Sequence, residues 1–261
     1  MLGKLLKNDL KKNMRWMWVL FTSTLVVASL TRGCKELGQS LAFFQILGIF
    51  FDSVFYALLI NSLIQPFLRS FINFTKSLFG DESYLTHTLP VTKNQILNSK
   101  YLTAIIEICL SFVCAICSLL IMFASSTMFN SLKLFLSTLI SGEFSLFLVL
   151  SIFVVLIIVE FIMFISIIFF SIIVAHKSTD KKVLKSFLIT AVMSFISITV
   201  LAIIMIFVLL ISGVDLTSKT LTLSGPILIS IVLTGIFVYS GMAILFYFLA
   251  KKELNKGVNV D

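Results

Sequence analysis

Charged residues are scarce in this chain. Asp, Glu, Lys and Arg together make up 12% of the 261 residues, whereas 59% are hydrophobic and 27 are Phe. A soluble globular domain has an apolar share of only roughly 45–50%. The composition therefore excludes a soluble domain and indicates a polytopic membrane protein.

Cysteine and histidine are also few, with 4 Cys and 2 His. Cys34 stands apart from the other cysteines, so no disulfide framework is expected. Cys114 and Cys117 have the spacing of a metal or redox pair, but the apolar run around them offers no completed ligand set, which favours packing. His87 and His176 are isolated, and we interpret His87 as a surface or interface residue.

Sequence motifs of membrane enzymes are missing as well. The chain contains no H-E-x-x-H zinc motif, no G-x-S-x-G nucleophile turn and no G-x-x-x-x-G-K-[ST] phosphate loop. We therefore predict that the chain is not an enzyme and holds no metal or cofactor itself. A nucleotide that drives this protein would have to bind another chain.

What the sequence does contain is long apolar runs. A membrane-spanning helix needs about 20 apolar residues, and six runs reach or approach that length. The runs are continuous rather than alternating, which favours helices over a barrel, because lipid requires backbone hydrogen bonds within each segment. We predict an all-α fold in which residues 1–261 form one domain with six transmembrane helices. The runs are residues 16–31, 41–66, 101–125, 144–175, 183–212 and 226–250.

The distribution of Lys and Arg predicts the orientation in the membrane. Short loops rich in these residues stay in the cytoplasm, and here every second connection is basic. Both termini are therefore expected in the cytoplasm. The net charge of +8 is explained by this pattern and by contact with anionic lipid, so no nucleic-acid partner is expected. The basic connections hold Lys4, Lys7, Lys11, Lys12 and Arg15; Arg69, Lys76, Lys93 and Lys100; Lys177, Lys181, Lys182 and Lys185; and Lys251, Lys252 and Lys256, whereas the alternate ones hold Arg32 and Lys35, Lys133 and Lys219.

The first residues have their own pattern. Apolar residues recur at helical spacing opposite the lysines from Leu2 to Met14, which predicts an amphipathic helix over residues 1–15 that lies on the membrane. A solvated basic tail is the alternative. A signal peptide is a third reading of the basic start and the following apolar run, but Trp16 and Trp18 favour a membrane-interface belt at the edge of a span.

One long polar stretch, Gly80 to Lys100, separates the second and third runs. Before it, Arg69 to Phe79 alternates apolar and polar residues, which suits a short helix at the cytoplasmic interface that Gly80 can end. Asp81 is a candidate N-cap for a second short helix, and Pro90 prevents its continuation.

The third span has a clear start signal. Thr92 is followed three residues later by Gln95, which is a capping box. Val91 and Ile96 occupy the positions of a hydrophobic staple. A long helix is therefore expected to begin at Lys93.

Three carboxylates fall within apolar runs, at Asp52, Glu107 and Glu160. Intramembrane carboxylates are candidate functional residues, and these three could line a substrate path. Protonated or hydrogen-bonded packing is the alternative for each of them. They leave open a secondary transporter driven by an ion gradient, and a non-transporting sensor or assembly subunit is a third possibility.

The string GDESYLTHTLPVT from Gly80 to Thr92, continued by Gln95-Ile96-Leu97 and Ser99-Lys100, resembles the region between the second and third spans of type-2 ABC transporter permeases. The acid, the Leu, the Leu-Pro and the downstream Lys of that region correspond to Glu82, Leu85, Leu89-Pro90 and Lys100. The resemblance implies that residues 67–95 form a coupling segment that docks on a separate ATPase subunit. The expected contact residues are Asp81, Glu82, Tyr84, Leu85, Leu89 and Pro90.

The same resemblance implies a function. Such a permease pairs with a second permease half, identical or related, while ATP is bound and hydrolysed by the ATPase subunit. We expect export of a hydrophobic or amphipathic substrate such as a peptide or lipid across a bacterial plasma membrane. Some members of the family carry large external helices between spans five and six, whereas Val214 to Gly225 is short here.

Overall fold

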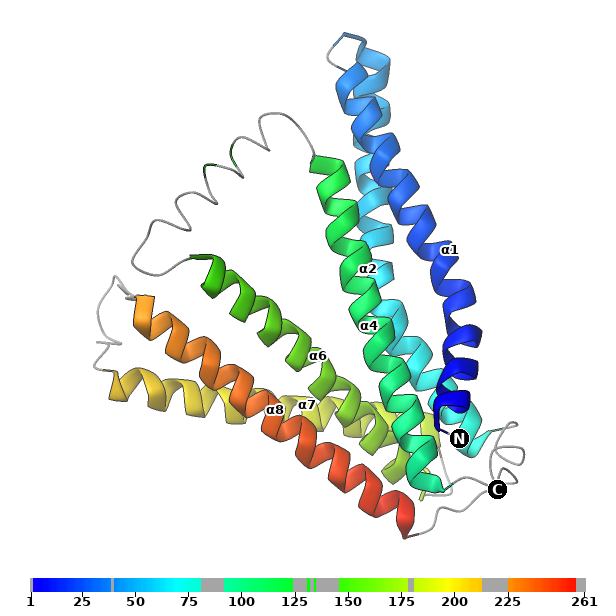
Figure 1. The fold of residues 1–261 in the computed structure, drawn as a ribbon, viewed down its shortest axis with the longest axis vertical. Helices are drawn as coiled ribbons and strands as arrows, with labels where there is room; N and C mark the ends of the chain where they lie inside the picture. The colour runs from blue at the N-terminus through cyan, green and yellow to red at the C-terminus, as the bar shows by residue number, and fades with distance from the viewer. Residues whose placement is uncertain are drawn as a thin grey trace. The chain divides into compact units, whose positions relative to one another are not determined.

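The structure of the chain is a computed structural model. It describes residues 2–38, 40–80, 92–123, 131, 134, 146–177, 181–212 and 225–256. Within these residues the chain forms long helices and no strand (Figure 1). The helices are α1 (Leu2–Leu37), α2 (Ala42–Phe79), α4 (Lys93–Phe123), α6 (Leu146–Ala175), α7 (Lys182–Ile211) and α8 (Gly225–Asn255).

Each of the six predicted apolar runs corresponds to one of these helices. All six helices contain a stretch that is long and apolar enough to cross a membrane. The predicted all-α fold is confirmed, and the chain is a multi-pass membrane protein by the length and composition of its helices.

The separate N-terminal helix that we expected over residues 1–15 is not seen. Residues 2–15 are instead the first turns of α1, which continues through the first apolar run to Leu37. The segment from Leu10 to Trp16 contains neither Gly nor Pro, so nothing in it interrupts the helical backbone. Met14 also packs against the buried cluster of Met17 and Phe21 with Cys114 of α4, so part of the apolar face contacts protein.

The expected break between the second span and the helix over Arg69–Phe79 is also absent. Helix α2 runs through Pro66 to Phe79, directly before Gly80. Proline removes one backbone donor, yet membrane helices tolerate it because neighbouring groups can satisfy the freed carbonyl. The end of this helix at Gly80 agrees with the prediction.

The start of α4 is confirmed in detail. The backbone N–H of Gln95 donates to Oγ1 of Thr92 at 3.3 Å, and the backbone N–H of Thr92 donates to Oε1 of Gln95 at 3.2 Å. These two reciprocal bonds are the capping box, and α4 begins at Lys93 as predicted. Val91 of the predicted staple lies outside the described residues.

Contacts group the chain into two compact units. The first unit comprises Met1–Ser77 and Tyr84–Lys133, and the second comprises Leu78–Ser83 and Leu134–Asp261. In the first unit α1, α2 and α4 share a core that includes Ala28, Phe55 and Met122. Here Oγ1 of Thr24 lies 3.4 Å from the buried Sγ of Cys114, which therefore packs between helices, whereas Cys117 is exposed.

The core of the second unit lies between α6, α7 and α8. Met163 and Ile167 of α6 pack there with Tyr239 and Phe246 of α8. A side chain at Gly235 would place its Cβ 2.8 Å from Cδ1 of Leu156, so the end of the Leu156 side chain packs directly against this glycine. Small residues commonly permit such close helix packing in membranes.

Candidate functional site

A group of buried and half-buried polar side chains joins α1, α2 and α4 in the first unit. We call it the polar cluster. Its members alternate with apolar residues at helical spacing, so each helix presents them on one face. The polar cluster consists of Asp9 and Asn13 from α1, Arg69 and Asn73 from α2, and Ser99, Lys100 and Glu107 from α4.

Asn13 is the central hydrogen-bonding residue of the polar cluster. Its Nδ2 donates to Oε1 of Glu107 at 2.6 Å, and its Oδ1 accepts from Nδ2 of Asn73, also at 2.6 Å. One side-chain amide therefore links all three helices. The two bonds also fix its orientation, because Glu107 needs a donor and Asn73 supplies one.

Glu107 is fully buried, with 0% of its surface exposed. The charged groups of Arg69, Asp9 and Lys100 lie close enough to interact with its carboxyl group electrostatically. Its Oε2 has no hydrogen-bond partner among the described residues. A buried carboxyl group is costly unless it is hydrogen-bonded, so the fold depends on Asn13 to hold this residue in place.

Asp9 and Lys100 form a largely buried ion pair. Nζ of Lys100 lies 2.8 Å from Oδ1 of Asp9, and each side chain is 16% exposed. Oγ of Ser99 donates to the other carboxylate oxygen at 3.1 Å. Removing one partner of such a pair would leave an uncompensated charge, so the pair fixes the position of α1 beside α4.

Arg69 makes a different contact between α1 and α2. Its Cζ lies 5.8 Å from the centroid of the Trp16 ring, a cation–π distance. Its Nε also donates to Oε1 of Gln65 at 3.3 Å. We expected Trp16 at the membrane interface, and its ring remains exposed while it contacts Arg69.

The polar cluster lies near the two helix ends that border the proposed coupling segment. Asn73 is six residues before the end of α2 at Phe79, and Ser99 is six residues after the start of α4 at Lys93. The predicted docking residues themselves lie outside the described residues. These are Asp81, Glu82, Tyr84, Leu85, Leu89 and Pro90.

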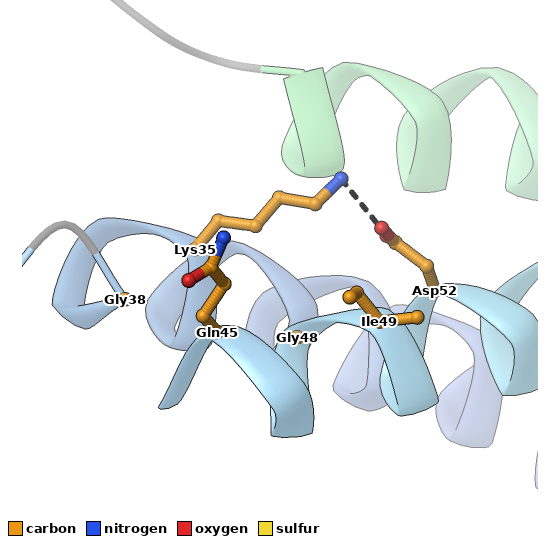
Figure 2. A pocket seen from close by; sticks show the side chains of 6 residues that line it. All are labelled: Lys35, Gly38, Gln45, Gly48, Ile49 and Asp52. Carbon is orange, nitrogen blue, oxygen red and sulfur yellow. Dashed lines mark ion pairs between the residues drawn. The ribbon is translucent and has the colours of Figure 1, made fainter. Parts of the chain in front are cut away.

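Asp52 forms an ion pair at the other end of the first unit. Its Oδ1 lies 2.9 Å from Nζ of Lys35, which comes from the last turns of α1 (Figure 2). The two side chains border a pocket of about 390 Å³. Asn73 lies 21 residues further along α2, or about 31 Å, so Asp52 is far from the polar cluster that contains Glu107.

Glu160 belongs to the second unit and lies in the middle of α6, about 22 Å from either end of that helix. Its side chain is exposed in the described structure. It lies close enough to the hydroxyl group of the buried Tyr239 to interact electrostatically. The three predicted carboxylates therefore have three different environments.

A further group of polar residues, not predicted from the sequence, lies where α6 and α8 end in the second unit. The buried His176 stacks on Phe79 with ring centroids 4.1 Å apart, and its Nδ1 lies 2.8 Å from the carbonyl oxygen of Ile172. Lys177 and Lys256 both pair with Glu253. Burial, together with the nearby charge of Lys182, lowers the pKa of His176 below its ordinary value of 6.5.

The sequence carried a partial signal for the polar cluster. Asp9 and Asn13 are four residues apart, as are Arg69 and Asn73, which places each pair on one helix face. The prediction of a helix on the membrane surface places this first pair away from the other helices, so it does not anticipate that Asn13 bonds to Glu107 or that Asp9 pairs with Lys100.

Among the described residues, no group of three or more His, Cys, Asp and Glu side chains is placed to hold a metal ion. The arrangement of the polar cluster suits a structural link between helices, because its charged and amide groups bond to each other across α1, α2 and α4. Comparisons with protein-family models, curated proteins and solved structures gave no match to this chain.

Proposed function

We propose that this chain is the membrane-spanning subunit of an ATP-driven transporter, and that its ATPase is a separate subunit. The observation that carries the proposal is the polar segment between α2 and α4, whose residues from Gly80 to Thr92 resemble the coupling region of type-2 ABC permeases. The proposed docking residues are Asp81, Glu82, Tyr84, Leu85, Leu89 and Pro90.

The geometry around this segment supports the proposal. Both helices that border it are fastened to α1 by the polar cluster, through Asn73 on one side and Lys100 on the other. A displacement of the segment would therefore move three helices together rather than one end of a loop. This is the mechanical property that a coupling element needs.

The proposed cycle requires differential binding. ATP closes the ATPase dimer, and the docked segment passes this movement to the helices of the first unit. Coupling arises only if the closed ATPase binds one conformation of the permease more tightly than the other, because a ligand with equal affinity for both shifts nothing. The substrate we propose is a hydrophobic or amphipathic molecule, such as a peptide or lipid, exported across a bacterial plasma membrane.

A second permease half, identical or related, completes the proposed transporter. The exposed Glu160 supports this part of the proposal. A charged group in the middle of a spanning helix costs at least about 2.5–3.5 kcal/mol in contact with lipid, so cover by protein or water is expected there. Protein outside the second unit, such as a second half, would supply such cover.

The docking proposal is tested with Leu85→Asp, which would place a charge in an apolar contact. We expect loss of co-purification with the ATPase, corresponding to roughly 2–4 kcal/mol if the contact is fully desolvated, while membrane insertion is retained. Ser83→Asp is the matched control, since it adds the same charge about 200° around the predicted helix. Co-purification of Leu85→Asp at wild-type stoichiometry, with normal transport, would exclude this segment as the main dock.

An alternative function is a secondary transporter driven by an ion gradient. The fully buried Glu107 is the observation that favours it. The two functions separate in vesicles that contain the chain without any ATPase. Transport in these vesicles that follows a proton gradient and is lost in Glu107→Gln would favour the secondary transporter. ATP-driven transport requires the second subunit in every case.

A further inference from the structure

The pocket between α1 and α2 has an unusual chemical composition for a membrane helix pair. It contains one cation, one anion and one amide, together with a single apolar side chain (Figure 2). Its volume of about 390 Å³ is within the range of about 300–1,000 Å³ that is typical of ligand pockets. The residues that line it are Lys35, Gly38, Gln45, Gly48, Ile49 and Asp52.

The side chain of Lys35 extends in an unusual direction for a lysine near the end of a spanning helix. Such a lysine normally extends its ammonium group toward water. Lys35 instead reaches Asp52, which lies ten residues into α2 and so about 15 Å from its start. The ion pair therefore links α1 and α2 at the end of α1 that is remote from the N-terminus, and both side chains stay partly exposed.

The ion pair is not saturated by the protein. The side chain of Lys35 is 44% exposed and that of Asp52 is 27% exposed. An ammonium group has three donors and a carboxylate has about four acceptor positions, so both groups keep hydrogen-bonding capacity after pairing with each other. Gln45 adds one donor group and one acceptor group at the same site.

Two glycines line the pocket. A Cβ at Gly38 would lie 3.0 Å from the carbonyl oxygen of Cys34 and 3.1 Å from the backbone nitrogen of Gln45, so a larger residue there would require the backbone to shift by a few tenths of an ångström. A Cβ at Gly48 would lie 3.8 Å from Cγ of Lys35, which is an ordinary van der Waals contact, so the stem of Lys35 packs directly beside this glycine.

The charge balance identifies the class of ligand. A lone anion at Lys35 would face the carboxylate of Asp52, and a lone cation would face the ammonium of Lys35. A molecule with both charges exchanges one internal ion pair for two intermolecular ones and leaves no net charge in the site. The neutral pair therefore favours a zwitterion over an ion.

We propose that this pocket binds the head group of an aminophospholipid, with its phosphate at Lys35 and its primary ammonium at Asp52. The exposed face of α2 beside the pocket explains why a lipid fits better than a free zwitterion. Phe43, Ile46 and Phe50 are exposed there at helical spacing and offer an apolar surface to acyl chains. The distribution of Lys and Arg predicts that this end of the helices faces the outer leaflet. The proposal does not depend on ATP-driven transport.

The test uses the purified full-length chain in detergent, without any ATPase, and native mass spectrometry of bound lipid. The wild-type protein is titrated with phosphatidylethanolamine, phosphatidylcholine and phosphatidylglycerol of the same acyl chains. We expect phosphatidylethanolamine to bind about tenfold more tightly than either of the others. The quaternary ammonium of phosphatidylcholine cannot donate hydrogen bonds, and phosphatidylglycerol lacks the cation. Equal binding of the three lipids would overturn the proposal, whether or not any variant folds.

Variants locate the site. Lys35→Gln and Asp52→Asn are each expected to weaken phosphatidylethanolamine binding about tenfold. Arg32→Gln and Glu36→Gln are the matched controls, because they disrupt another ion pair at the same end of α1 and should leave binding unchanged. Wild-type affinity in both pocket variants would overturn the assignment.

Soluble glycerophosphoethanolamine distinguishes the source of the ligand. Weak competition supports the lipid. Competition as strong as that of the intact lipid would overturn the lipid assignment in favour of a zwitterion taken from water.

Discussion

Asn13 illustrates how one side chain can set the arrangement of three membrane helices. It accepts a hydrogen bond from α2 and donates one to α4, and both contacts are 2.6 Å long. A hydrophobic residue at this position would leave the carboxyl group of Glu107 without its donor and the amide of Asn73 without its acceptor. The cost of a change at Asn13 is therefore larger than the value of a single hydrogen bond.

We predict that Asn13→Leu lowers the free energy of unfolding by about 2–4 kcal/mol, because the buried Glu107 and the half-buried Asn73 both lose their partner. Thermal unfolding of the purified protein in detergent measures this effect. Asn8→Leu is the control, since Asn8 lies on the exposed face of the same helix. If the two variants unfold at the same temperature, Asn13 does not hold the polar cluster together.

Pairing with Glu107 can be measured separately. In a double-mutant cycle, Asn13→Leu and Glu107→Leu should show a coupling free energy of about 1–3 kcal/mol, because the double variant leaves no carboxyl group without a donor. Simple additivity of the two single variants would contradict the bond between them. This cycle isolates α1 and α4 from the contact with Asn73.

His176 makes the stability of the second unit depend on pH. Burial and the charge of Lys182 lower its pKa, so the folded protein binds this proton less readily than the unfolded chain does. The contribution of His176 to the free energy of unfolding is therefore fully present above pH 6.5. It decreases as the pH falls below that value, by at most about 1.4 kcal/mol per pH unit. Unfolding temperatures measured between pH 7.5 and 5.5 should show this decrease.

His176→Phe should reduce that pH dependence. The carbonyl of Ile172 keeps its backbone partner in this variant, because the backbone N–H of His176 also donates to it at 3.1 Å. Phenylalanine can also keep the stacking contact with Phe79. Parallel curves for the wild-type protein and the variant would assign the pH dependence to other groups.

At the level of whole elements, the capping box of α4 controls the first turn of a helix that borders the proposed coupling segment. We predict that Thr92→Ala weakens this turn by about 1 kcal/mol and increases amide hydrogen exchange in residues 93–96 about fivefold. Thr22→Ala is the control, because the Thr22 hydroxyl bonds only to carbonyls of its own helix. Unchanged exchange in the first turn of α4 would show that the box contributes little.

Helix positions could be predicted well because they depend on local chemistry. Thr92 and Gln95 contain the start signal of α4, and Gly80 follows the last residue of α2. The two predicted helix breaks, one before the first span and one after the second, were wrong because the local sequence does not interrupt the helix at either place. Residues 10–16 contain no helix-breaking residue, and Pro66 is accommodated inside α2.

The contacts between helices could not be predicted in the same way. The spacing of Arg69 and Asn73 shows which side chains share a face, but it does not show which helix that face meets. Asp52 and Glu107 were identified as candidates from their place in apolar runs, whereas their partners Lys35 and Asn13 are fixed only by tertiary packing.

At the level of the whole molecule, the predicted orientation can be tested by thiol labelling. Cys34 should react with a membrane-impermeant reagent in intact cells, whereas a cysteine introduced as Ser178→Cys should react only after the membrane is opened. The reason is the alternation of basic and non-basic connections. Cys34→Ser serves as the background control. The reverse labelling pattern would place the segment between α2 and α4 outside the cell.

Helix α2 has a further consequence for how the molecule can move. It is continuous from Ala42 to Phe79 and about 57 Å long, whereas the hydrocarbon core of a bilayer is only about 30 Å thick. A rigid body of that length acts as a lever, and a swing of about 10° around one end displaces the other by roughly 10 Å. If α2 rotates about a point near the Lys35–Asp52 pocket, a small change of its angle there would produce a much larger displacement at Phe79, where the helix meets the proposed coupling segment. Pro66, which lacks a backbone donor, marks the point at which this lever would bend first.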